Sequence, residues 1–165
     1  MERGYKIDLP IEIELIIIIF LYSSIFLGHV RSYYSLFWWW DIVLHTGSGI
    51  ALGLIGFLIV LSLQRTEKIK AKPSLIAILT FSFALAMGAL WEIFEFAMDQ
   101  ILKTGMQRYG LVDTMWDLIV DSLGALLASF VGYFYLKEKK TYFIKSVVRY
   151  YIKNNPHIFN NKRQR

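Results

Sequence analysis

The sequence predicts an all-α protein, a four-transmembrane-helix bundle with both termini cytoplasmic and a basic amphipathic helix at the C-terminal end. Three observations support this prediction. Hydrophobic residues make up 56% of the 165 residues, whereas a soluble domain has about 45–50%. Four segments are mostly apolar for about 20 residues, the length that crosses a bilayer. Lys and Arg lie mainly on one side of those segments, as the positive-inside rule requires.

Each expected span is an apolar run between polar breaks. We expect one transmembrane domain over residues 1–136, because a chain of this length is one domain by default. Glu2 and Asp8 spoil the positive flank that a cleaved signal peptide needs, so we expect the first run to remain as a span. The four spans are expected at about 11–30, 42–63, 74–98 and 112–136.

The positions of the basic residues predict the orientation. All but three of the 18 Lys and Arg residues fall before the first span, between spans two and three, or after the fourth. The exceptions are Arg31, Lys103 and Arg108. Cytoplasmic loops carry the excess of Lys and Arg, so we expect a multi-pass protein of the cell membrane with its N- and C-termini in the cytoplasm. The positive charge then reports topology, and we expect no nucleic-acid partner.

The tail over residues 137–165 has a different pattern. Apolar residues recur on one face of a helix, and Lys145, Arg149 and Lys153 recur on the opposite face. This spacing is typical of a helix that lies on an anionic membrane surface. Docking onto a partner protein is the alternative. The apolar face consists of Phe143, Ile144, Val147, Val148 and Tyr151.

The most informative residues are the ionisable ones inside the spans. A charge in the hydrocarbon costs at least about 2.5–3.5 kcal/mol, so such residues usually mark a site. Asp41 and His45 are one turn apart at the start of span two, and Gly49 and Gly53 continue their face as small residues that let another helix approach. Carboxylates line one stripe in each of the last two spans: Glu92, Glu95 and Asp99 in span three, and Asp113, Asp117 and Asp121 in span four.

The predicted orientation places all three groups at one level, in the outer half of the bilayer. Crowded carboxylates cannot all ionise without cations, shared protons or hydrogen-bond donors. Oxygen ligands with one imidazole suit a divalent ion such as Mg²⁺, Mn²⁺ or Zn²⁺. We therefore predict metal ligands at Asp41, His45, Glu92, Glu95, Asp117 and Asp121; catalytic roles for His45, Glu92 and Asp117; and substrate contacts from Asp99, Arg108 and Asp113.

Simpler roles remain open for several of these residues. Asp41, Asp99 and Asp113 lie near helix ends, where a carboxylate can face solvent, and at a helix N-terminus a carboxylate is also favoured electrostatically. His45 could belong to a buried hydrogen-bond network. The chain has no cysteine, which excludes thiol catalysis and Cys-ligated metal sites. The sequence patterns of zinc proteases, nucleophile-elbow hydrolases and phosphate-binding loops are also missing.

Three segments resemble the YjdF-like family of small bacterial and archaeal membrane proteins, with a more distant likeness to VanZ-like proteins. The resemblance implies a helical bundle with its motifs around one polar site, and it implies no particular activity. The matching segments are Asp41-Ile-Val-Leu-His45-Thr-Gly-Ser-Gly49, Gly88-Ala-Leu-Trp-Glu92-Ile-Phe-Glu95, and Asp113-Thr-Met-Trp-Asp117-Leu-Ile-Val-Asp121-Ser-Leu-Gly124-Ala.

Three function classes are consistent with these patterns. The first is a divalent-metal-dependent hydrolase or transferase that acts on a lipid-linked or phosphate ester. The second is a non-catalytic membrane scaffold whose acids bind a basic partner. The third is a cation- or proton-coupled transporter, which a chain this small would perform as a homo-oligomer. The bilayer is a partner in all three.

Overall fold

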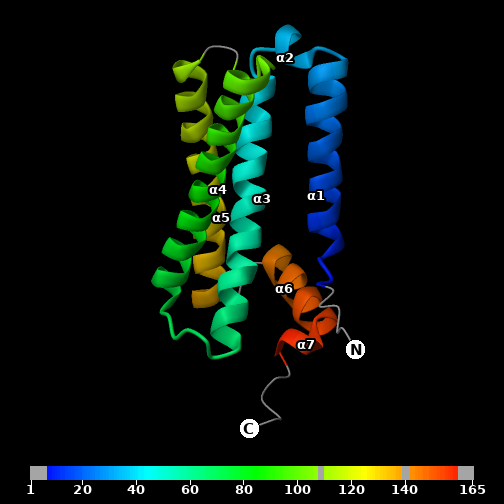
Figure 1. Cartoon of the computed structure of the whole chain (residues 1–165). Helices are drawn as coiled ribbons and strands as arrows, with labels where there is room; N and C mark the ends of the chain where they lie inside the picture. The colour runs from blue at the N-terminus through cyan, green and yellow to red at the C-terminus, as the bar shows by residue number, and fades with distance from the viewer. Residues whose placement is uncertain (1–6, 108–109, 139–141, 160–165) are drawn as a thin grey trace, which may run out of the picture.

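The computed structural model describes residues 7–107, 110–138 and 142–159, and these residues form helices without a strand (Figure 1). A π-helix, η1, continues the first α-helix, and short helices α2 and α7 follow longer elements. In chain order the elements are α1 (Ile11–Leu21), η1 (Tyr22–Val30), α2 (Tyr33–Leu36), α3 (Trp40–Arg65), α4 (Pro73–Leu102), α5 (Leu111–Glu138), α6 (Tyr142–Asn154) and α7 (Pro156–Phe159).

Four of these helical segments are long and apolar enough to cross a membrane, which confirms the predicted four-helix bundle. They are Ile11–Val30, Trp40–Arg65, Pro73–Leu102 and Leu111–Glu138. The later three extend beyond the predicted spans by one to four residues at their ends. The helix α2 lies at one end of the bundle and α6 at the other (Figure 1), and we call these the α2 end and the α6 end. Which end is cytoplasmic stays a prediction.

The closest helix pair is α3 with α5, and glycines permit its approach. A Cβ atom at Gly49 would collide with the backbone carbonyl of Asp121, and a Cβ at Gly124 would collide with the carbonyl of Thr46. Farther along, a Cβ at Gly53 would overlap the methyl group of Ala128. The prediction that small residues on this face admit a neighbouring helix is confirmed.

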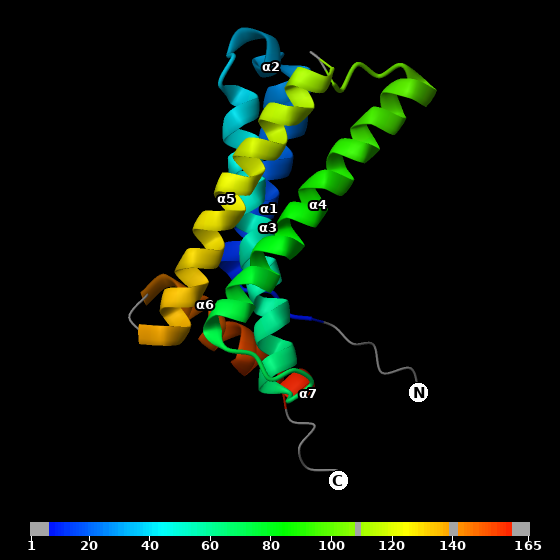
Figure 2. The same cartoon turned by 90° about the vertical axis from the view of Figure 1, so that its left-hand side faces the viewer.

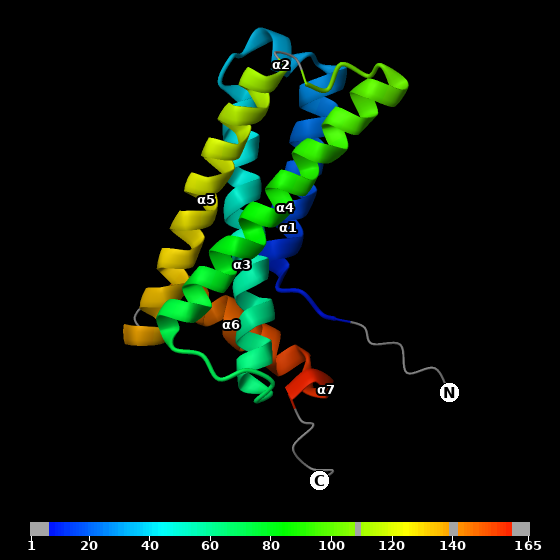
Figure 3. The same cartoon turned by 60° about the vertical axis from the view of Figure 1, so that its left-hand side comes forward.

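The other two spans are arranged more loosely. Figure 2 shows α4 leaning away from α5 toward the α2 end, and Figure 3 shows the same divergence of the two helices from another side. The α1 helix stands apart from α3 over much of its length (Figure 1). Its side chains at Ile18 and Ile19 are both 61% exposed, as expected for lipid-facing residues, whereas Ile13 near the α6 end is buried.

The amphipathic helix of the tail forms, but its apolar face is covered by protein. Ile144, Val147, Val148 and Tyr151 are buried in the same core as Ile13 of α1 and Phe57 of α3. The helix lies between α1 and α3 at the α6 end (Figure 1), where the separation of those spans leaves apolar surface to cover. Lys145, Arg149 and Lys153 are exposed. The expected membrane-facing role of the apolar face is therefore corrected; the Phe143 side chain lies outside the described residues.

One fully buried side chain fastens this end of the bundle. Asn155 accepts a hydrogen bond from the backbone N–H of Asp8 at 2.8 Å and donates one to the Asp8 carbonyl at 2.7 Å. Its amide also lies 2.8 Å from the Tyr151 carbonyl. The helix α6 ends at Asn154 and α7 starts at Pro156, so Asn155 joins the two helices and ties them to the segment that leads into α1.

Two glycines of α3 provide a matched test of the α3–α5 contact. A Cβ at Gly47 meets nothing within 4 Å, whereas a Cβ at Gly49 meets backbone atoms of α5. We expect Gly49→Ala to lower the free energy of unfolding by about 1–3 kcal/mol, the usual cost of overpacking. Gly47→Ala should be neutral or stabilising by up to about 1 kcal/mol, since alanine favours the helix. Thermal unfolding in detergent measures both, and equal melting temperatures would contradict the packing.

Candidate metal centre

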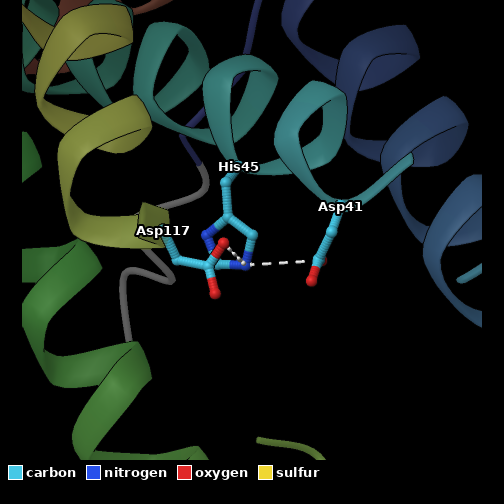
Figure 4. Close-up of side chains that lie close together, drawn as sticks. All are labelled: Asp41, His45 and Asp117. Carbon is cyan, nitrogen blue, oxygen red and sulfur yellow. Dashed lines mark ion pairs between the residues drawn. The ribbon is translucent and has the colours of Figure 1, made fainter. Parts of the chain in front are cut away.

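Asp41, His45 and Asp117 converge near the α2 end of the bundle (Figure 4). The His45 Nε2 atom lies 3.8 Å from Asp41 Oδ1 and 3.8 Å from Asp117 Oδ1. These separations are too long for hydrogen bonds. One ligand atom from each residue lies within 4.8 Å of the other two, so the three side chains border a small polar space.

The helices place these residues together for simple geometric reasons. Asp41 lies in the first turn of α3, and His45 follows four residues later on the same face. Asp117 lies on α5, which the glycine contact holds against this part of α3. His45 is 9% exposed and Asp117 is 4% exposed. The sequence predicted only that these groups lie at one depth, and the structure adds a contact between spans two and four.

The second imidazole nitrogen faces a different carboxylate. His45 Nδ1 lies 3.4 Å from Asp121 Oδ2, a long hydrogen bond. The Ser48 hydroxyl lies 3.0 Å from Asp121 Oδ1 and 2.8 Å from the His45 carbonyl. Asp121 therefore orients the ring from the side opposite to Asp41 and Asp117. No polar role was predicted for Ser48 from the sequence, although its i, i+3 spacing from His45 was an available signal.

Glu92 of α4 is the most unusual carboxylate of the group. It is 4% exposed, and neither of its side-chain oxygens has a hydrogen-bond partner within the described part of the chain. The Thr114 hydroxyl near Glu92 accepts a hydrogen bond from the Gln107 side chain at 2.7 Å, which leaves its own O–H free to point toward the Glu92 carboxylate. Glu92 is close enough to interact electrostatically with His45 and Asp121. A buried carboxylate with no donor normally requires a cation or a proton.

The other predicted site residues do not belong to the three-residue group. Glu95 accepts a hydrogen bond from the Trp91 indole at 2.9 Å and does not belong to the three-residue group. Asp113 is half-buried near the start of α5. Arg108 lies outside the described residues.

Asp99 has a clear local role. It accepts hydrogen bonds from the Thr104 hydroxyl at 2.5 Å and from the backbone N–H groups of Met106 and Gln107 at 2.7 and 2.8 Å. Lys103, at the end of α4, adopts a left-handed conformation, and the Asp99 carboxylate stabilises the turn that follows. Both of its oxygens are engaged within the chain, which argues against the predicted substrate contact.

A cavity of about 590 Å³ opens beside the centre. It lies between α1 and η1 on one side and α3 and α4 on the other, and residues 104–106 border it at the α2 end. Its wall includes Asp41 and His45 of the three-residue group and the nearby polar residues Ser48, Glu95 and Asp121. The volume falls within the range of about 300–1,000 Å³ that is usual for ligand pockets.

Comparison with known proteins places the chain in a family. Residues 1–138 match a family model described as a predicted membrane protein (DUF2238). A protein of Thermotoga maritima, described as uncharacterized, is 33% identical over 125 residues, which cover 73% of this chain. The chain spans 62% of the length of that relative. No solved structure matches. With its four apolar helices, the chain is an integral membrane protein that belongs to the DUF2238 family.

Proposed function

We propose that Asp41, His45 and Asp117 bind a divalent metal ion and that the protein is a metal-dependent hydrolase or transferase of a phosphate ester. The observation that carries this proposal is the triangle of donor atoms in which His45 Nε2 lies 3.8 Å from an oxygen of each of two carboxylates. Two donor atoms that share one ion at about 2.1 Å lie up to about 4.2 Å apart. One nitrogen and two oxygen donors suit Zn²⁺ or Mn²⁺, and the carboxylates also suit Mg²⁺.

The hydrogen-bond partners of the proposed metal ligands also support a metal site. A histidine that binds a metal through one nitrogen commonly donates its other N–H to a carboxylate, which fixes the tautomer and the ring orientation. Asp121 occupies that position on Nδ1, and the Ser48 hydroxyl lies within hydrogen-bond distance of Asp121 in turn. Asp121 is therefore proposed to orient His45, in place of the direct ligand role expected from the sequence.

Glu92 is the proposed general base. It is buried, its oxygens accept no hydrogen bond of good geometry from the described residues, and it interacts electrostatically with His45. In hydrolysis, it would accept a proton from the attacking water as the new P–O bond forms, and return that proton to the leaving oxygen as the ester P–O bond breaks. A bound divalent ion would supply charge neutralisation for the phosphate and acidify the water.

A second candidate function is cation or proton transport. Glu92 favours it, because an unpartnered carboxylate inside a span is typical of ion and proton pathways. Under this alternative, replacement of Glu92 would stop flux into liposomes and would leave no phosphate-releasing activity to measure. No specific contact favours the scaffold hypothesis, which stays a prediction, as do the homo-oligomer and the VanZ-like likeness.

Metal binding is the first test. We expect the purified wild type, loaded with Mn²⁺ or Zn²⁺ and then dialysed, to retain a stoichiometric ion by elemental analysis. His45→Ala and Asp117→Asn should lose it, because each removes a ligand. Asp121→Asn should weaken affinity by about 10–100-fold, the usual effect of losing the partner of a metal-binding histidine. Glu14→Gln, on the exposed surface of α1, is the control. An ion retained by His45→Ala would contradict the site.

The rate of phosphate release distinguishes the proposed role of Glu92 from the role of the metal ligands. With a long-chain alkyl phosphate as substrate, we expect Glu92→Gln to slow phosphate release by about 10²–10⁴-fold, the usual contribution of a general base. The same variant should keep the bound metal and the melting temperature of the wild type. Phosphate release at the wild-type rate would remove Glu92 from the mechanism, and loss of the metal would make it a ligand.

A further inference from the structure

The wall of the cavity changes character along its length. At the α2 end its α3 wall carries the polar residues Asp41, His45 and Ser48 among the apolar residues Trp40, Val43 and Leu44. Deeper in the bundle, its α3 wall consists of Ala51, Leu52 and Ile55. Because polar and apolar walls follow each other along one axis, the cavity matches a molecule with a polar head and an apolar body.

The opposite wall, formed by α1 and η1, is likewise apolar in its deep part and more polar toward the α2 end. Ile16 and Phe20 of α1 border the deep part, and Ser24 and His29 of η1 border the part nearer the α2 end. The Ser24 hydroxyl lies 3.1 Å from the Tyr34 hydroxyl of α2, so the polar groups on this wall satisfy each other. The deep part offers hydrocarbon on both sides, where a chain of methylene groups is bound by burial alone.

The length of the cavity fits a lipid chain. Its α3 wall runs from Trp40 to Ile55, which at a rise of about 1.5 Å per residue is about 22 Å. One leaflet contributes about 15 Å of hydrocarbon thickness. A lipid that lies along α3 with its head at the His45 centre can therefore place much of one chain within the cavity.

We propose that this cavity holds one hydrocarbon chain of a membrane lipid whose phosphate ester lies at the Asp41–His45–Asp117 centre. The inference rests on the proposed function and names its substrate class as a lipid phosphate ester. Carboxylates alone would repel a phosphate, and a cation between them makes the two compatible. The chain enters from the bilayer beside α1, where Ile19 borders the cavity and is 61% exposed.

The test uses a long-chain alkyl phosphate with a photoreactive diazirine near the end of its chain. After irradiation in detergent, peptide mapping by mass spectrometry locates the label. We expect labelling to concentrate on the deep wall, at Ile16, Ala51, Leu52 and Ile55, and to be displaced by an excess of the unlabelled compound. In the wild-type protein, labelling that is spread evenly over the exposed faces of all four spans would overturn the proposal.

A matched pair of substitutions tests the space directly. Ala51 lines the cavity, whereas Ala86 of α4 is exposed on the bundle surface and does not line it. Ala51→Trp should weaken displaceable labelling by at least about tenfold, because excluding even two methylene groups has that effect. Ala86→Trp should label like the wild type. Ile16→Trp fills the cavity from α1 and provides a second variant if Ala51→Trp does not fold. Wild-type labelling in a folded cavity-filling variant would contradict the proposal.

Metal content distinguishes this inference from the function on which it rests. If Ala51→Trp loses the label and keeps the ion, the lipid cavity and the metal centre are both supported. If the wild type binds no metal but still labels on the deep wall in a displaceable way, the lipid cavity stands and the metal centre is wrong. If the wild type binds metal but labels nowhere on the deep wall, the metal centre stands and the lipid chain is wrong.

Discussion

The close approach of α3 and α5 is the constraint on which the rest of the structure depends. Between helices in a membrane there is no hydrophobic driving force, so association relies on close packing and on polar contacts. Gly49 and Gly124 remove the side chains that would hold the two backbones apart. The polar residues His45, Ser48 and Asp121 lie at the same contact. Packing and polar chemistry are therefore parts of one interface.

This interface gathers several carboxylates around one imidazole. Asp41, Asp117 and Asp121 surround His45, and Glu92 approaches from α4 with no hydrogen bond of good geometry from the described residues. One protonated histidine offers a single positive charge to these four carboxylates. An uncompensated buried charge is strongly destabilising. The proposed cation, together with protons shared among the acids, would reconcile this group with a stable fold.

The sequence predicted the spans and the faces of the centre well, because both follow from periodicity. Asp41 and His45 share a face through their spacing alone, and so do Asp117 and Asp121. The division of roles around His45 could not be predicted, because it depends on which ring nitrogen faces which carboxylate. Asp99 was interpreted as a substrate contact, since its spacing within the α4 stripe gives no sign of the turn that its carboxylate stabilises.

The surroundings of helix α6 also could not be predicted from the spacing of its residues. An apolar face made of Ile144, Val147 and Val148 has the same spacing whether lipid or protein covers it, and only the gap beside α1 decides between them. The separation of α1 from α3 has a consequence for the biosynthesis of the protein. The hydrogen bonds between Asn155 and Asp8 join residues 147 positions apart, and contacts of such long range form late in folding. The first span therefore enters the bilayer early in synthesis but reaches its final place only after the last helices have been made.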